Sequence, residues 1–305
     1  MSQPRPGTRI VVIAGVTAAS KTATALALAR ARDGELIGAD SVQVYRGFDV
    51  GSAKPTAAEL GGVRHHLIDA IDPDESIDAG RYQALADAAI ADVASRGKLP
   101  IVVGGTGLWL RTLVRGLIEL PPPDPALRAE LEADADRVGG PALHARLAEV
   151  DPVYAARIHE NDRRRIVRAL EVWRQTGEAM GALQDAHAKG APRYDATVHL
   201  LDRERDDLYA AIRRRIRAML DAGWVDEVKA LLERWGPDVR PMNSVGYREV
   251  KAHVLDDVPL EETERLAYKA TRIYTRRQRT WFNNDPMGGA WTDAERVLAS
   301  GDEGQ

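Results

Sequence analysis

The sequence predicts an α/β protein built on a P-loop NTPase-like parallel sheet flanked by helices, with an all-helical insertion domain. Two glycine-rich turns, at residues 15–22 and 104–107, each lie between an apolar strand-like run and a helical segment. Strands that alternate with helices form parallel sheets, whose loops gather at one edge of the sheet. The third observation is that residues 120–190 contain helical patterns but no strand-like run, which predicts the insertion.

Length and composition indicate a globular protein of ordinary type. The chain has 305 residues, a hydrophobic fraction of 44% and a net charge of −4, so nucleic acid would have to be held by local basic clusters. The absence of cysteine excludes disulfides, thiolate metal sites and cysteine nucleophiles. There is no apolar signal core near Met1 and no apolar run of about 18 residues, so we expect a cytoplasmic protein with no membrane association.

The first glycine-rich turn has the features of a phosphate-binding loop. It reads Gly-Val-Thr-Ala-Ala-Ser-Lys-Thr, after the apolar run 10–13 and before the alanine-rich segment 23–30. A strand-loop-helix unit aims backbone N–H groups and the positive end of a helix dipole at one point. Lys21 adds a full charge, and the Thr22 hydroxyl suits a phosphate-bound Mg²⁺. The loop residues predicted to bind diphosphate are Gly15, Val16, Thr17, Ala18, Ala19, Ser20, Lys21 and Thr22.

Ser20 departs from the pattern G-x-x-x-x-G-K-[ST], which has glycine at that position. A Cβ penalises positive φ and hinders close approach of the backbone to phosphate oxygens. Serine is the smallest substitute that still donates to a phosphate, so we expect a usable loop with some strain. The loop alone leaves open an ordinary strand-to-helix turn that binds no phosphate.

The remaining elements continue the alternation of strand and helix. Residues 34–48 predict a short strand that delivers Asp40 and Ser41 at its carboxyl end, where open α/β sheets bind ligands. Further strands are expected at 63–69, 99–103 and 197–201, and helices at 80–96, 108–114, 206–234 with an interruption near Gly223, and 260–281.

The predicted domains follow from this pattern. Residues 1–119 and 191–285 are expected to form the core, residues 120–190 the insertion, and residues 286–305 a partly mobile tail. Within the insertion, residues 157–168 concentrate positive charge, and Asp162 is the expected N-cap of a helix that runs to Trp173.

The motifs together resemble the tRNA dimethylallyltransferase family, the bacterial isopentenyltransferases that prenylate an adenosine beside the anticodon. The resemblance runs from about residue 9 to residue 283. Besides the two glycine-rich turns it rests on residues 40–55, 65–69, 149–152, 156–162, 165–171, 245–248 and 276–281. The family loop is similar to Gly-Pro-Thr-Ala-Ser-Gly-Lys-Thr, so Val16, Ala19 and Ser20 depart from it.

The resemblance implies transfer of a dimethylallyl group from dimethylallyl diphosphate to the exocyclic N6 of adenosine 37 in tRNA. The phosphate loop, Lys21 and Mg²⁺ at Thr22 would spread the charge of the leaving diphosphate, and Arg215 would complete the clamp. Asp40 is the implied base for the amine proton, and Thr106 would fix the same amine or a phosphate oxygen. We expect a monomer.

The resemblance also implies that a base leaves the stack of the tRNA anticodon stem-loop and enters the cleft. The residues assigned to tRNA binding are Asp40, Ser41, Val42, Gln43, Thr106, Arg128, Arg164, Arg165, Ile166, Val167, Arg168, Arg248, Arg276, Arg277 and Gln278. Phosphate contacts of this kind make binding salt-dependent. Beside Arg215, we expect Arg213, Arg214 and Arg217 to form a solvated helix face.

Two other functions remain open. A phosphate loop before a sheet cleft suits ATP equally well, which would make the protein a nucleoside or nucleotide kinase. Alternatively, Ser20 marks a decayed phosphate site in an RNA-binding relative with impaired catalysis.

Overall fold

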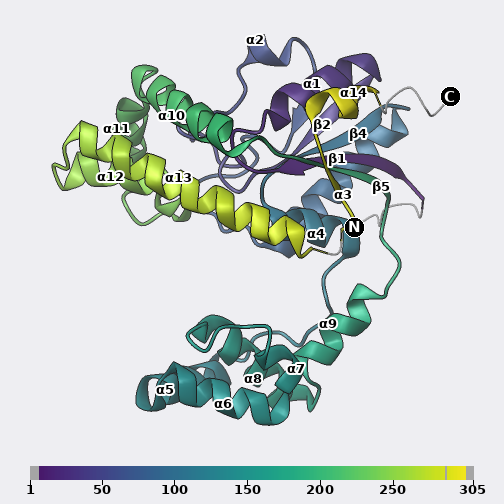
Figure 1. The fold of residues 1–305 in the computed structure, drawn as a ribbon, viewed down its shortest axis with the longest axis vertical. Helices are drawn as coiled ribbons and strands as arrows, with labels where there is room; N and C mark the ends of the chain where they lie inside the picture. The colour runs from purple at the N-terminus through teal and green to yellow at the C-terminus, as the bar shows by residue number, and fades with distance from the viewer. Residues whose placement is uncertain (1–6, 286, 300–305) are drawn as a thin grey trace. The chain divides into compact units, whose positions relative to one another are not determined.

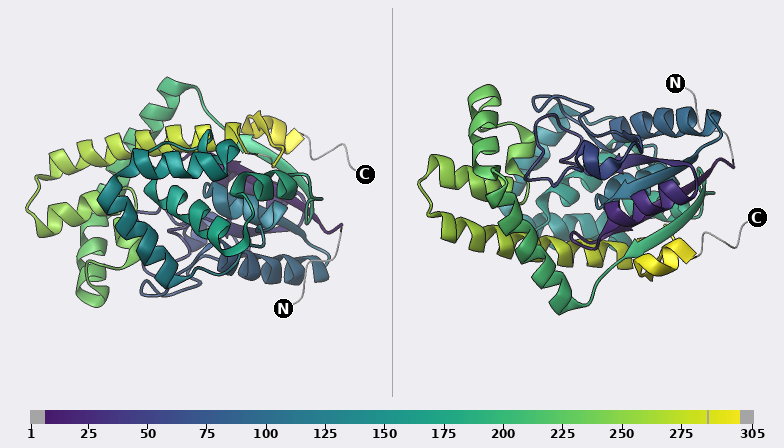
Figure 2. Two further views of the ribbon diagram at one scale, coloured as in Figure 1. Left: turned by 90° about the horizontal axis from the view of Figure 1, so that it is seen from below. Right: turned by 90° about the horizontal axis from the view of Figure 1, so that it is seen from above.

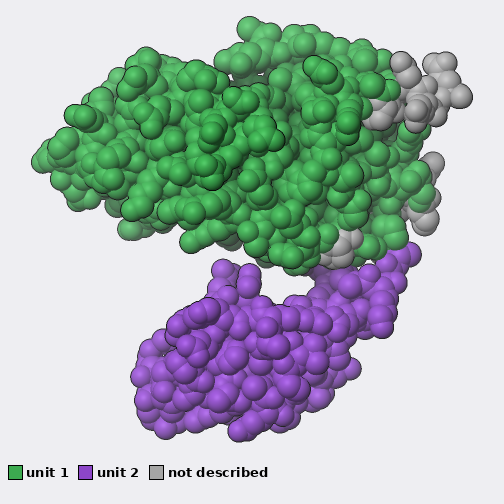
Figure 3. Space-filling model, viewed as in Figure 1, with its two compact units in different colours: residues 1–116, 192–305 green, residues 117–191 purple. Residues whose placement is uncertain are grey.

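The computed structural model describes residues 7–285 and 287–299 (Figure 1). The chain divides into two compact units, which Figure 3 shows in different colours. Unit 1 comprises residues 1–116 and 192–305, and unit 2 comprises residues 117–191.

Unit 1 is built on a sheet in which all pairings between the described strands are parallel, so the predicted parallel sheet is confirmed. The strand order is β3-β2-β4-β1-β5-β6. The strands are β1 (Arg9–Gly15), β2 (Gly34–Ala39), β3 (His65–His66), β4 (Leu99–Gly104), β5 (Asp195–Leu201) and β6 (Ala290–Thr292). The central strands are nearly continuous apolar runs because helices cover both of their faces.

Helices pack on both faces of this sheet (Figure 2). On one face α1 (Lys21–Ala31) packs against α14 (Ala294–Ala299), and on the other α3 (Ala79–Ser95) packs against α4 (Gly107–Arg115). The registers Gly15↔Leu201 and Ala39↔Gly104 place the carboxyl ends of four strands at one edge. The glycine-rich turns and the Asp40 turn therefore meet there.

A second group of helices extends unit 1 beyond this edge. It contains α10 (Arg205–Asp221), α11 (Trp224–Trp235), the 3-10 helix η1 (Arg240–Asn243), α12 (Tyr247–Leu255) and α13 (Leu260–Asn283). The short helix α2 (Ala57–Leu60) lies apart from this group, where Arg30 of α1 donates to the carbonyl oxygen of Glu59. Gly223, at φ 95°, separates α10 from α11, so the predicted interruption is confirmed. The long helix α13 packs along α10 and also contacts β1 (Figure 1).

The described residues 117–191 of unit 2 form helices and no strand, as the sequence predicts. Its helices are α5 (Pro125–Val138), α6 (Gly140–Val150), α7 (Pro152–Ala155), α8 (Arg163–Thr176) and α9 (Met180–Ala188). They enclose a separate apolar core around Leu131, Leu147 and Ile166. Asp162 caps α8 by accepting a hydrogen bond from the backbone N–H of Arg165. Across the described parts of the chain, no helix combines the length and apolar character needed to cross a membrane.

Two segments of the chain differ from their sequence predictions. The strand expected over 63–69 shortens to β3, because Leu67 and Asp69 adopt left-handed conformations that end the extended backbone. Residues 290–299, assigned to the tail, form β6 and α14, and β6 pairs with β5 through His199↔Ala290. The mobility expected of the last residues falls on 300–305, which lie outside the described residues.

Candidate active site

The loop between β1 and α1 is shaped by its first residues. A Cβ on Gly15 would lie 2.0 Å from the carbonyl oxygen of Leu201, so only glycine fits there. Val16 donates its N–H to that same oxygen, and Ala19 donates to Val16. Val16 and Ala19 are buried. This placement does not support the predicted diphosphate contacts of Gly15, Val16 and Ala19, which instead fix the course of the loop.

A cavity of about 810 Å³ lies over the rest of the loop. The loop residues that line it are Thr17, Ala18, Ser20, Lys21 and Thr22. The Lys21 ammonium donates to the carbonyl oxygen of Val16 at 2.7 Å. Burial and the nearby Arg215 lower the pKa of Lys21 to about 8, although Asp40 opposes this shift. The cavity therefore holds a partly desolvated cation, which an anionic ligand would stabilise.

Ser20 adopts the left-handed conformation that the sequence pattern reserves for glycine. Its φ is 62° and its ψ 23°, which costs a residue with a Cβ about 1–2 kcal/mol. Its hydroxyl oxygen accepts a hydrogen bond from Arg203 Nη2 at 2.6 Å. Sequence reasoning missed Arg203, although the pairing of β5 with β1 places the residues after Leu201 beside the loop. Arg203 thus places a second cation, after Lys21, next to the serine that replaces the glycine of the phosphate-loop pattern.

Asp40 lies directly after β2 in a tightly held turn. Its Oδ1 accepts hydrogen bonds from the backbone N–H groups of Val42 at 2.9 Å and Gln43 at 3.2 Å. The Thr106 hydroxyl accepts from the N–H of Ser41 at 3.1 Å. Thr106 occupies the N-cap position of α4 without a side-chain capping bond, so its hydroxyl serves the Asp40 turn instead.

A second cavity of about 380 Å³ adjoins the first. Its walls include Ser41 and Val42 on the Asp40 turn, and the aromatic side chains of Trp224, Tyr247 and Tyr274. The residues that line both cavities are Thr17, Asp40, Arg215 and Met219. Asp40 and Arg215 therefore lie at the junction of an anion-suited cavity and an aromatic one.

Among the arginines at positions 213, 214, 215 and 217, Arg215 is the one that lines the two active-site cavities. Its Nη2 donates to the carbonyl oxygen of Ser52 at 3.1 Å. Burial lowers the pKa of Arg215, and the Asp40 carboxylate opposes that shift. The neighbouring Arg213 and Arg214 are exposed.

Gln278 joins the two glycine-rich turns. Its Oε1 accepts from the N–H of Thr17 at 2.9 Å and from the Thr17 hydroxyl at 3.1 Å, while its Nε2 donates to the carbonyl oxygen of Gly105 at 3.0 Å. The side chain is buried, with 5% exposed. Because its amide is occupied and enclosed, the tRNA contact predicted for Gln278 is not supported, and the residue holds the turns together.

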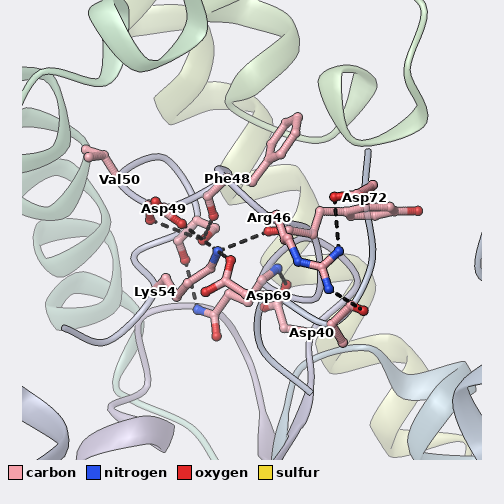
Figure 4. A network of polar contacts seen from close by, with 12 residues as sticks. Asp40, Arg46, Phe48, Asp49, Val50, Lys54, Asp69 and Asp72 are labelled. Carbon is pink, nitrogen blue, oxygen red and sulfur yellow. Dashed lines mark hydrogen bonds and ion pairs between the residues drawn. The ribbon is translucent and has the colours of Figure 1, made fainter. Parts of the chain in front are cut away.

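The segment after the Asp40 turn is fixed by a nearly buried lysine that sequence reasoning missed (Figure 4). Lys54 Nζ donates to Asp49 Oδ1 at 2.5 Å, to Asp69 Oδ1 at 2.6 Å and to the carbonyl oxygen of Tyr45. The amide of Gln43 donates to the backbone of Ser52 and Ala53. Only the resemblance over residues 40–55 signalled this network, since its partners are dispersed along the chain.

A carboxylate in the second unit holds two of the arginines assigned to RNA. Glu171 is fully buried and pairs with Arg128 at 2.7 Å and Arg168 at 2.8 Å. Burial raises the pKa of Glu171, but hydrogen bonds from Arg168, Arg128 and the Asp124 backbone outweigh it and lower the pKa below its ordinary value. Arg128 and Arg168 thus have structural partners within unit 2.

The other predicted RNA contacts of unit 2 divide by burial. Arg164 and Arg165 are exposed at the start of α8, with Arg165 3.4 Å from Asp162. The side chains of Ile166 and Val167 are buried, with 0% and 2% exposed. Their placement does not support the tRNA contacts predicted for them, because both side chains pack into the core of unit 2.

In unit 1, the three arginines predicted to bind tRNA are exposed. Arg248, at the start of α12, pairs with Glu249 at 2.6 Å. Arg276 and Arg277 are exposed near the end of α13, and Arg277 also lines the smaller cavity.

The described residues contain no group of three or more His, Cys, Asp or Glu side chains able to hold a metal ion. Thr22 lines the larger cavity beside Lys21. A hydroxyl together with substrate phosphate oxygens is a donor set that Mg²⁺ accepts, since this ion is commonly held by one or two protein oxygens plus phosphates and water. Thr22 is therefore compatible with a metal that enters with a diphosphate.

The chain has close relatives along nearly its whole length. A family model described as IPP transferase matches residues 43–285. A tRNA dimethylallyltransferase from Anaeromyxobacter dehalogenans (strain 2CP-1 / ATCC BAA-258) is 51% identical over 283 residues, which are 93% of this chain and 92% of the relative. One from Sorangium cellulosum (strain So ce56) is 46% identical over 287 residues, covering 94% of this chain and 91% of the relative.

Comparison with solved structures points to the same family as the sequence relatives do. The full-length tRNA isopentenylpyrophosphate transferase from Bacillus halodurans superposes with a TM-score of 0.69 at 37% identity, covering 96% of this chain and 94% of that one. A eukaryotic dimethylallyltransferase, in a structure described as acting on tRNA, gives a TM-score of 0.78 at 26% identity, covering 94% of this chain and 74% of that one. The chain therefore belongs to the IPP transferase family.

Proposed function

We propose that this protein transfers the dimethylallyl group of dimethylallyl diphosphate to the exocyclic N6 of the adenosine beside the anticodon of tRNA. The observation that carries the proposal is the position of Asp40 and Arg215, which line both the larger, cationic cavity and the smaller, aromatic one. The names of the curated relatives favour prenyl transfer over the kinase alternative.

The larger cavity would receive the diphosphate. With the N–H groups of Val16, Thr17 and Ala19 already bonded, those of Ala18, Ser20, Lys21 and Thr22 are the candidates for phosphate oxygens. The charges of Lys21 and Arg215 would stabilise the negative charge that develops on the leaving group. Mg²⁺ at the Thr22 hydroxyl, when bound, would neutralise further charge on the diphosphate.

The smaller cavity would receive the extruded adenine. The amine nitrogen would bond to the allylic C1 while the bond between C1 and the diphosphate oxygen breaks, and Asp40 would take the amine proton. Adenine amines are weak nucleophiles, so much of the rate would come from positioning. Thr106 would contribute by fixing the turn that carries Asp40, through the N–H of Ser41.

RNA phosphates would be held by exposed arginines of each unit. We assign this role to Arg164 and Arg165 of unit 2 and to Arg276 and Arg277 of unit 1, all four exposed. Since one chain supplies both cavities, we propose a monomer that acts in the cytoplasm on the anticodon stem-loop.

The decisive experiment incubates the protein with tRNA and Mg²⁺, and with either dimethylallyl diphosphate or labelled ATP. We expect prenylated adenosine from the first mixture and no labelled phosphoryl product from the second. Phosphoryl transfer would identify a kinase. Retention of tRNA without any product would identify an RNA-binding protein whose phosphate loop, with Ser20, has lost its activity.

The lowered pKa of Lys21 predicts a pH effect on diphosphate binding. In the unliganded protein this ammonium loses its proton as the pH rises through about 8, whereas bound diphosphate favours the charged form. Affinity for dimethylallyl diphosphate should therefore fall between pH 7 and pH 9, measured by calorimetry. A Lys21→Met variant should bind more weakly throughout and lose this dependence. An identical pH profile in that variant would contradict the assignment.

A further inference from the structure

A basic groove lies between α10 and α13 and shares no lining residue with either cavity of the active site. It has a volume of about 480 Å³, and α10 and α13 run side by side along it (Figure 1). Its cationic lining residues are Arg213, Arg265, Lys269, Arg272 and Arg276. Tyr268 and Ile273 complete the lining, and no described carboxylate is part of it.

The cations of α13 follow one face of the helix. Arg265, Lys269, Arg272 and Arg276 are spaced four, three and four residues apart, so they form a stripe about 16 Å long. Like charges at such spacings destabilise an isolated helix. A chain with a net charge of −4 nevertheless concentrates positive charge here, and an anionic partner would relieve the repulsion within the stripe.

The carboxylates near the groove lie at the end formed by Arg213 and Arg265, where Glu261, Glu262 and Glu264 line an adjoining cavity. Arg265 pairs with Glu262 at 2.5 Å. Among the described residues, no carboxylate lies within ion-pair distance of Arg213, Lys269, Arg272 or Arg276, the four remaining cations of the groove.

Tyrosine rings lie beneath two of the guanidinium groups of the groove. Arg213 lies 4.8 Å from the centroid of Tyr268, and Arg272 lies 4.1 Å from the centroid of Tyr209. Stacking of this kind restrains an arginine while leaving N–H donors at its edge for planar bidentate contact with phosphate.

We infer that this basic groove binds the sugar-phosphate backbone of the tRNA substrate next to the extruded nucleotide. The inference rests on the proposed function. Its geometric basis is that α13 has two adjacent functional faces: Thr271 and Tyr274 line the aromatic cavity, while Arg272 and Arg276 line the groove. Since consecutive helix residues lie about 100° apart, RNA that delivers a base to one face brings its phosphates within reach of the other. Arg213, expected from the sequence to be a solvated residue, is thereby assigned to RNA.

RNA suits this groove better than a membrane does. Peripheral membrane binding needs exposed apolar side chains beside the cations, whereas the groove is concave and Ile273 is the one aliphatic side chain among the described residues that line it. Arginine, lysine and tyrosine are the side chains that contact RNA phosphates and stack on bases.

The test removes two of the unpaired cations in the variant Arg213→Gln/Lys269→Gln. We expect tRNA affinity about tenfold lower at low salt, and a plot of log affinity against log salt that is shallower by about 1.4, for two lost single-strand phosphate contacts. The KM for tRNA should rise, while kcat and the KM for dimethylallyl diphosphate stay unchanged. Lys269→Glu, a single change at an exposed position of α13, should give the same direction of change if the double variant unfolds.

The matched control is Lys229→Gln/Arg234→Gln, which removes two exposed cations from α11, outside the groove. It should bind tRNA with the wild-type affinity and salt slope. If the wild-type protein prenylates tRNA but the two double variants bind tRNA with equal affinity and salt slope, the groove assignment alone would be overturned. Loss of binding to phosphatidylserine vesicles in the groove variant, with tRNA binding unchanged, would identify a membrane surface instead. Failure of the wild-type protein to prenylate tRNA would overturn the proposed function.

Discussion

Replacement of Asp40 by asparagine should slow prenyl transfer about 10²–10⁴-fold, the range found when a general base is lost. Asparagine keeps the Oδ1 acceptor for the N–H groups of Val42 and Gln43, so the turn itself should survive. What disappears is the carboxylate at the junction of the two cavities. Single-turnover rates with saturating tRNA and dimethylallyl diphosphate measure the effect, and binding of each substrate should change little.

The control for Asp40 is Asp72→Asn in the same polar network (Figure 4). Asp72 pairs with Arg46 at 3.0 Å and lines neither cavity. This variant should react at the wild-type rate. Equal single-turnover rates for Asp40→Asn and wild type would show that the carboxylate takes no part in proton removal.

Replacement of Arg215 by lysine should lower kcat about 10²–10³-fold, the scale of losing one preorganised donor to a developing anion. A lysine cannot reproduce the planar fork that bonds to Ser52 and reaches both cavities at once. Its ammonium would also lie beside Lys21, whose pKa the present guanidinium already lowers. We expect a higher KM for dimethylallyl diphosphate together with the lower kcat.

Arg214→Lys provides the adjacent control. Arg214 is exposed, and it lines neither cavity. Steady-state kinetics should separate the two variants clearly, because charge is conserved in both and position alone differs. Indistinguishable kinetics would mean that Arg215 contributes only charge, or contributes nothing.

Local patterns predicted most of the fold because they act over short distances. The apolar runs of β1 and β4 and the helix break at Gly223 are readable from neighbouring residues. β6 escaped prediction because three residues are too few for a periodicity, and its place is fixed by pairing with β5. The strand expected over 63–69 ends early because Leu67 adopts a left-handed backbone conformation. An apolar residue such as leucine rarely adopts this conformation, so the sequence did not predict the end of the strand.

Site residues were predictable where they lie next to a strand end, and unpredictable where they depend on distant partners. Asp40 directly follows β2, and Lys21 begins α1 after the short loop that follows β1, so both belong to turns with recognisable patterns. The structural role of Arg128 depends on Glu171, and that of Gln278 on Thr17, which lies 261 residues away. Nor could spacing alone show that Arg213 of α10 faces the charged stripe of α13.

The amide of Gln278 has a consequence for how members of this family can diverge. One side chain spans the gap from Thr17 to Gly105, and a Cβ on Gly105 would lie only 2.5 Å from its Nε2. Lengthening either turn by a residue would break that span unless the other turn or α13 shifted to match. Insertions and deletions should therefore be excluded from both turns together, and evolutionary change there confined to substitutions such as the one at Ser20.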